Sequence, residues 1–144
     1  MKKMILILTM SFATSVAFAS GIVVNPKVLE AFRKEFVNVQ EVKWSEGPDY
    51  CIAQFIYNGQ SVRAYYNNSG ESLGLFRYIS PLNLPVNLQL SLKKRYGSFW
   101  ITDLYELSKG GVANYFITIE DADESVMLKA ASDNDWVQFK SVEK

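Results

Sequence analysis

Hydrophobic residues recur at helical spacing in two stretches of the chain, and each stretch opens with a proline. The apolar positions are Leu29, Phe32 and Phe36 in the first stretch and Leu88, Leu92 and Tyr96 in the second. Asn25 precedes Pro26 as a plausible N-cap, and Leu84 precedes Pro85. Proline suits the first position of a helix because its missing N–H would have no partner there. The pattern predicts two helices, each with one apolar face that packs on a sheet.

Elsewhere, hydrophobic and polar residues alternate with the period of two that is typical of β-strands. We expect strands over residues 50–57, 61–66, 73–79, 113–119, 126–131 and 136–142. Asn58-Gly59 is a two-residue hairpin signal, and Asn68-Ser69-Gly70 marks a second turn. The strands are therefore expected to form an antiparallel meander.

The two halves of the chain, about 25–80 and 84–142, contain the predicted elements in the same order. The offset between equivalent positions is nearly constant, as in Phe36 to Tyr96 and Phe76 to Phe139. Such self-similarity predicts an α+β fold built as a tandem repeat of a helix followed by an antiparallel β-meander, with both helices packed on one sheet face. Together the repeats would make one compact domain over residues 20–144.

Residues 1–19 have the three parts of a secretory signal. Lys2 and Lys3 precede an apolar run that extends to Val16, and Ala17-Phe18-Ala19 provides a small-x-small cleavage site. The run is shorter than the roughly 20 apolar residues that span a bilayer. We expect a mature protein that begins at Ser20, works in the periplasm or outside the cell, and does not insert into a membrane.

Composition removes several functional classes. The 144 residues include 15 basic and 15 acidic side chains, and this neutral balance argues against nucleic acid as a partner. There is no histidine, which is the commonest general base and zinc ligand. The single cysteine, Cys51, falls in a predicted strand and is interpreted as a packing thiol. The sequence predicts no catalytic residue, no metal site and no cofactor.

Acidic clusters fall at predicted hairpin turns, where such residues are common. They are Glu120, Asp121, Asp123 and Glu124 in one turn, and Asp133 and Asp135 in the other. The first cluster lacks the central glycine and the distant glutamate of a calcium loop. An enzyme that uses carboxylates alone stays open, because glycosidase chemistry needs two acids and no histidine.

The charged and amide residues of the strands, placed outward, assign the two faces of the sheet. The inner face then collects Cys51, Ala53, Phe55, Tyr57, Val62, Ala64, Tyr66, Phe76, Tyr78, Tyr115, Ile117, Ile119, Val126, Leu128, Val137 and Phe139. The outer face collects Tyr50, Ile52, Ile56, Tyr65, Leu75, Phe116, Met127 and Trp136, together with Arg63, Arg77 and Lys129.

The expected outer face is too apolar for an idle solvent surface. Aromatic residues mixed with arginine are typical of protein recognition surfaces. We expect a non-catalytic module that binds an envelope or secreted protein or peptide through Tyr50, Arg63, Tyr65, Arg77, Phe116 and Trp136. Two alternatives stay open: loops or a dimer partner cover this face, or the protein carries a small molecule or lipid in a cavity between helices and sheet.

A set of core and turn positions carries a family resemblance. The set consists of Phe32 and Phe36, Val42 and Trp44, Tyr65-Tyr66 in a strand that ends at Gly70, and Leu84-Pro85 at the second helix. It resembles secreted PepSY-like proteins related in fold to β-lactamase-inhibitory protein, over essentially the whole mature chain. The resemblance implies tandem helix-plus-sheet repeats and an extracytoplasmic binding or inhibitory role; the inhibitory protein engages its target with its concave sheet face. Cys51 stands alone here, whereas the inhibitory protein has cysteine pairs, so β-lactamase inhibition is not implied.

Overall fold

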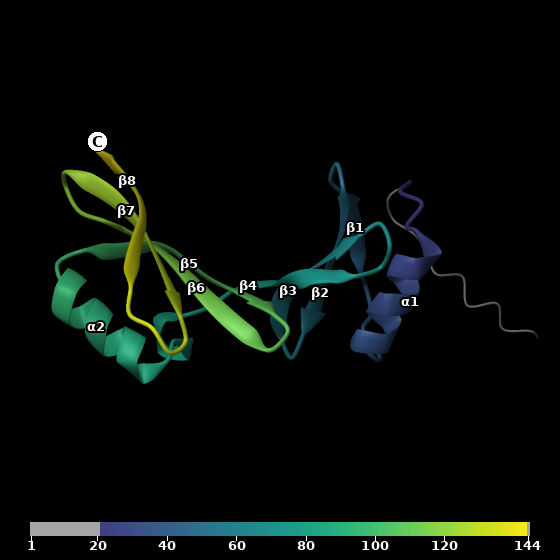
Figure 1. The fold of residues 1–144 in the computed structure, drawn as a ribbon, viewed down its shortest axis with the longest axis horizontal. Helices are drawn as coiled ribbons and strands as arrows, with labels where there is room; N and C mark the ends of the chain where they lie inside the picture. The colour runs from purple at the N-terminus through teal and green to yellow at the C-terminus, as the bar shows by residue number, and fades with distance from the viewer. Residues whose placement is uncertain (1–20, 144) are drawn as a thin grey trace, which may run out of the picture.

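The computed structural model describes residues 21–143, and the expected signal sequence lies outside them. In chain order the elements are α1 (Pro26–Glu35), β1 (Lys43–Glu46), β2 (Tyr50–Tyr57), β3 (Gln60–Asn67), β4 (Ser72–Tyr78), the short 3-10 helix η1 (Pro81–Asn83), α2 (Val86–Tyr96), β5 (Trp100–Lys109), β6 (Val112–Glu120), β7 (Glu124–Ala131) and β8 (Val137–Glu143). Within the described range the eight strands form one antiparallel sheet in sequence order, and α1 and α2 lie at opposite ends of it (Figure 1). No helix in this part of the chain is long and apolar enough to cross a membrane.

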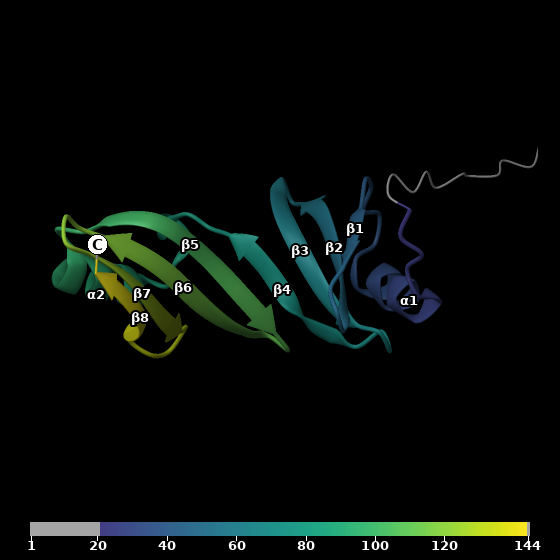
Figure 2. The ribbon, with the colours of Figure 1, turned by 90° about the horizontal axis from the view of Figure 1, so that it is seen from above.

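The continuous sheet overturns the predicted tandem repeat of helix-plus-meander units. β4 and β5, which were expected in different repeats, pair directly from Leu75 opposite Ser108 to Tyr78 opposite Tyr105. β4 therefore lies between β3 and β5 in the middle of a single sheet (Figure 2). The helices have only 10 and 11 residues, and each covers its own end of the sheet instead of forming one shared layer.

Two strands, β1 and β5, were not predicted from the sequence. β1 has four residues, which is too short to show a clear alternation. Only three residues lie between α2 and β5, and no strand was predicted over the residues of β5. α2 ends at Tyr96, as its apolar pattern indicated, and β5 starts at Trp100.

Two hydrophobic clusters fill the inner face, one beneath each helix. The first joins Val28 and Phe32 of α1 to the inward residues of β1, β2 and β3, and the second joins Leu88 of α2 to those of β5, β6 and β7. The Phe32 ring packs edge-on against Trp44 and Phe55 at centroid distances of 5.3 and 5.1 Å. Burial of one such ring stabilises the fold by about 1.5 to 3 kcal/mol.

Two predictions for the first half of the chain are confirmed: the packing role of Cys51 and the N-cap role of Asn25. Cys51 is buried, and burial, with a smaller contribution from nearby Glu46, raises the pKa of its thiol. Asn25 caps α1, since its Oδ1 accepts a hydrogen bond from the Lys27 N–H at 2.9 Å. The start of α1 also packs on the turn between β3 and β4, where a Cβ at Gly70 would lie 2.6 Å from the Lys27 carbonyl oxygen. Only glycine fits this close approach, and its φ of 84° favours glycine as well.

Trp136 belongs to the core, contrary to its predicted place on the outer face. Its side chain is 2% exposed, and its Nε1–H donates to the Leu88 carbonyl oxygen at 3.0 Å. The prediction started a strand at Trp136, but β8 begins one residue later, and the indole fills the space under α2. Arg95 of α2 donates to the Trp136 carbonyl oxygen and to Asp135, both at 3.1 Å.

The burial of Trp136 leads to a prediction about stability. Trp136→Ala leaves a large void under α2 and should lower the free energy of unfolding by about 3 to 5 kcal/mol in urea denaturation. Val137→Ala is the matched control, because the next side chain is 66% exposed and should change the value by less than about 0.5 kcal/mol. Equal losses in the two variants would contradict the assignment of Trp136 to the core.

Candidate recognition surface

Cross-strand pairing arranges the residues of the outer face in rows that run across the strands. We call two adjacent rows the central rows. One consists of Lys43, Gln54, Arg63, Phe76, Leu107, Asn114 and Ala131, and the other of Tyr78, Tyr105, Phe116, Lys129 and Val137. Both helices pack on the inner face, so no helix of the described chain covers these rows.

Five aromatic rings on this face touch one another in sequence, and we call them the aromatic ladder. Phe76 contacts Tyr78 at 5.0 Å and Tyr105 at 4.9 Å between ring centroids. Tyr105 stacks on Phe116 at 5.1 Å with an interplanar angle of 12°, and Phe116 meets Phe139 at 6.1 Å. The rings come from β4, β5, β6 and β8, so the ladder spans most of the sheet's width.

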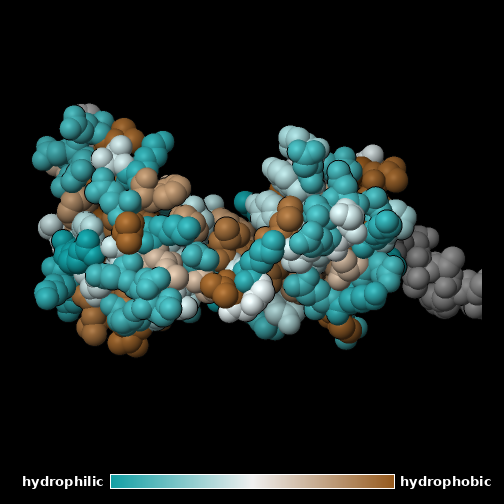
Figure 3. Space-filling view, viewed as in Figure 1, coloured by the Kyte–Doolittle hydropathy of each residue, from teal (hydrophilic) through white to brown (hydrophobic). Residues whose placement is uncertain are grey.

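Much of the ladder faces solvent. Tyr78 is 56% exposed and Phe139 is 62% exposed, while the three rings between them are half-buried. Burial, with smaller contributions from Asp103 and Tyr78, raises the pKa of Tyr105. Hydrophobic side chains also lie among hydrophilic ones across the middle of the molecule in Figure 3. A contiguous apolar surface of this kind commonly marks an interaction site.

Two cations lie over the ladder. The Arg63 guanidinium is 5.5 Å from the centre of the Phe76 ring, and the Lys129 ammonium is 5.4 Å from that of Phe116. Within residues 21–143, the ion pairs join Lys34 to Glu30, Arg77 to Glu106 and Arg95 to Asp135, and neither Arg63 nor Lys129 takes part in one. Their charges remain available to a carboxylate from outside the chain.

Four of the six residues predicted for binding lie on the outer face. Arg63 and Phe116 belong to the central rows, and Tyr65 lies next to them on β3. Tyr50 contacts Tyr65 at 5.9 Å between ring centroids, at the β1 end of the sheet. The structure therefore places Arg63 and Phe116 in one surface with the ladder and Tyr50 and Tyr65 beside it. Trp136, in the core, is not part of it.

Arg77 lies on the inner face, which corrects its predicted outward position. A bulge opposite Tyr65 and Tyr66 shifts the register of β4, so Arg77 pairs with Val62 on one side and Glu106 on the other. Its Nε and Nη2 donate to the two Glu106 carboxylate oxygens at 3.2 and 2.9 Å, and Nη1 donates to Gln60 at 3.1 Å. The hydrogen bonds to Glu106 raise the pKa of Arg77 and compensate the Glu106 carboxylate, which is only 8% exposed.

Three ladder residues lie on the face opposite to the one that the sequence predicted, and the register shift of β4 accounts for two of them, Phe76 and Tyr78. Phe76 and Tyr78 were expected inward and lie outward. Val137 and Phe139 were also expected inward and lie outward, because β8 starts with Val137 opposite the outward Lys129, and the Phe139 ring contacts Phe116. Tyr105 belongs to the strand that was not predicted. Gly74 was the available signal, since a glycine inside a strand indicates a bulge.

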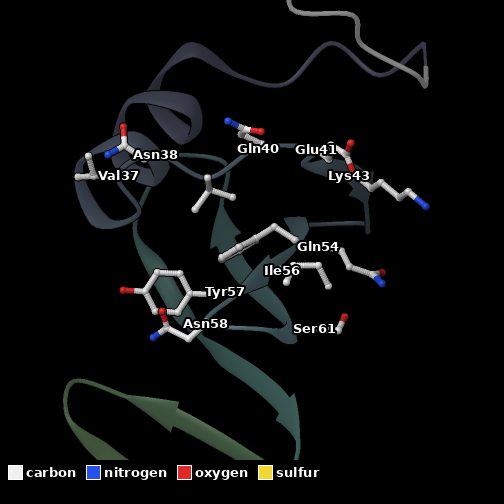
Figure 4. A pocket seen from close by; sticks show the side chains of 12 residues that line it. Val37, Asn38, Gln40, Glu41, Lys43, Gln54, Ile56, Tyr57, Asn58 and Ser61 are labelled. Atoms are coloured by element: carbon white, nitrogen blue, oxygen red, sulfur yellow. The ribbon is translucent and has the colours of Figure 1, made fainter.

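A groove of about 700 Å³ lies at the free edge of β2 (Figure 4). Figure 4 shows the side chains of the 37–41 loop on one side and those of the end of β2 on the other. β1 pairs with β2 only from Cys51 to Gln54, which leaves the end of β2 beyond it. The lining mixes amides, apolar groups, Glu41 and Lys43. Within residues 21–143, no group of three or more His, Cys, Asp or Glu residues could hold a metal ion.

The centres of the two hydrophobic clusters are filled, which bears on the alternative of a ligand carrier. Val28 and Leu88 on the helices and Ala53 on the sheet are completely buried within the two clusters. Beside α1, an open groove of about 570 Å³ is lined by Phe32 and Phe36, by the 37–42 loop and by Trp44. The geometry thus favours the uncovered sheet face over an internal cavity as the binding region.

Three solved structures share this fold over most of the chain. A DUF2874 family protein from Bacteroides ovatus has a TM-score of 0.74 and 17% identity, covering 85% of this chain and 89% of its own. A BLIP-like protein from Bacteroides fragilis has a TM-score of 0.69 and 16% identity, and the match covers 81% of this chain and 84% of that protein. A protein from Bacteroides eggerthii, provisionally assigned to the periplasm, has a TM-score of 0.70 and 11% identity. The match covers 82% of this chain and 87% of that protein. No protein-family model and no curated protein matches the chain.

These similarities establish the fold. The BLIP-like side of the expected resemblance is supported, since one of the three structures carries that description. None of the three is described as PepSY, so that part of the resemblance gains no support from them.

The Arg77–Glu106 pair gives a second stability prediction. Arg77→Met should lower the free energy of unfolding by about 2 kcal/mol, because it leaves the buried Glu106 carboxylate unpaired. Glu106→Leu added to that variant should restore most of the loss, as measured by urea denaturation of the four proteins of the double-mutant cycle. Lys34→Met is the control, since the Glu30–Lys34 pair is exposed and should contribute nothing measurable. Additive losses from Arg77→Met and Glu106→Leu would show that the pair is not coupled.

Proposed function

We propose that this protein is a non-catalytic extracytoplasmic module that binds a protein or peptide through the aromatic ladder and its flanking cations. The observation that carries the proposal is the ladder itself, five contacting rings on a sheet face that no helix of the described chain covers. Such a surface combines rigid aromatic anchors with a polar surround, which is the composition of binding hot spots. Of the residues predicted from sequence, Arg63 and Phe116 belong to this surface, and Tyr50 and Tyr65 lie beside it.

Two further observations support an extracytoplasmic binding role. Residues 1–19 have the pattern of a secretory signal, and a structural neighbour is provisionally assigned to the periplasm. Another neighbour is BLIP-like, a description that refers to an inhibitory protein. The fold carries such a role over to this chain only by analogy, and the PepSY-like resemblance adds to it in the same way. The surface therefore provides the main argument.

Cross-strand aromatic contacts also stabilise sheets, so the test must separate binding from folding. Tyr78→Ala with Phe139→Ala removes the two most exposed rings of the ladder, where the cost to folding should be smallest. The matched control is Leu82→Ala with Leu90→Ala, which removes two exposed apolar side chains outside the sheet. Circular dichroism and thermal unfolding should confirm that both variants are folded.

We expect the wild-type protein and the control to capture the same partner from envelope extract and the ladder variant to lose it. With the purified partner, each lost anchor should cost about 2 kcal/mol, or roughly thirtyfold in affinity, by calorimetry. A partner held equally by the ladder variant and released by the control would place the interface elsewhere and contradict the proposal.

A further inference from the structure

The charges of the central rows have one sign. Their charged residues are Lys43, Arg63 and Lys129, and neither row contains an aspartate or glutamate. On the outer face, Asp103 lies one row beyond them, opposite Thr118. Because the whole chain has 15 basic and 15 acidic residues, this local excess of positive charge is a property of the face and not of the protein.

Arg63 and Lys129 are the cations best placed to meet a partner. Each lies over a ring of the ladder and lacks an ion-pair partner within residues 21–143. An aromatic ring beneath a cation holds the cation in position. The polar hydrogens of the cation can still point outward to an acceptor. A guanidinium held in this way is prepared for a carboxylate, which it can bind with two parallel hydrogen bonds.

The pairing also fixes how far apart the two cations are. Arg63 is on β3 and Lys129 on β7, four strand spacings apart, and they occupy adjacent rows. With about 4.8 Å between strands, the separation is about 20 Å. Phe76, Tyr105 and Phe116 lie between them and supply an apolar centre.

From this geometry we infer that the partner is acidic and presents two carboxylates about 20 Å apart on either side of an apolar segment. The inference rests on the proposed function and specifies the chemistry of its partner. An extended segment covers that distance with about six residues, and a helix with about thirteen. Charge complementarity of this kind steers encounter and selects the partner, while the ladder supplies most of the affinity.

Peptide display on the purified protein tests the inference without knowledge of the natural partner. A library of random 16-residue peptides is selected against the wild-type protein, and clones that also bind the Tyr78→Ala and Phe139→Ala variant are removed. The remaining clones depend on the ladder. We expect them to be enriched in aspartate and glutamate on both sides of apolar residues, and to bind more weakly as salt is added.

Charge variants then separate the two cations from general electrostatics. Arg63→Gln with Lys129→Gln should weaken the selected peptides by about tenfold or more. Lys93→Gln with Lys94→Gln removes the same charge from the exposed end of α2 and should leave binding unchanged. Ladder-dependent peptides that are neutral or basic, or that tolerate loss of Arg63 and Lys129, would overturn the inference and leave the proposed function standing. Failure to recover any ladder-dependent peptide would overturn both.

Discussion

The pairing of β4 with β5 is the interaction on which the rest of this structure depends. It joins two hydrophobic clusters, each under its own helix, into one sheet. On the inner face the junction is polar, because Arg77 and Glu106 bridge the two strands there. On the outer face the same pairing sets Phe76 beside Leu107 and Tyr78 beside Tyr105. A slip of one residue would exchange the two faces of β4 and break the aromatic ladder.

The two faces of the sheet differ in burial because of this arrangement. The two short helices pack on the inner face, so the apolar residues of that face are buried in the two hydrophobic clusters. The outer face keeps rings that contact one another but leave part of their surface in water. In the isolated protein these rings stabilise the sheet only through cross-strand contacts. A bound partner would also bury their exposed surface. The proposed recognition role would account for both the rings and the cations above them.

Much of the inner face could be predicted from sequence, because burial there follows simple periodicity. Phe32, Ala53 and Ile117 occupy the expected places, and both helices begin after the expected prolines or at them. Prediction failed where structure breaks periodicity or depends on distant partners. The bulge next to β4 reversed the faces of Phe76 and Arg77, whose charge is tolerated inward only because Glu106 lies opposite. Likewise, nothing local shows that Leu88 accepts a hydrogen bond from Trp136.

Hydrogen exchange of the isolated protein, read residue by residue by NMR, tests most directly whether one continuous sheet supports the outer face. If β4–β5 pairing unites the two clusters, the paired amides of β4 and β5 should exchange only on global unfolding, as those of β2 and β6 do. Fast exchange confined to β4 and β5, with β2 and β6 still protected, would contradict the account. The two ends would then open independently, and the aromatic ladder would not be a single preformed surface.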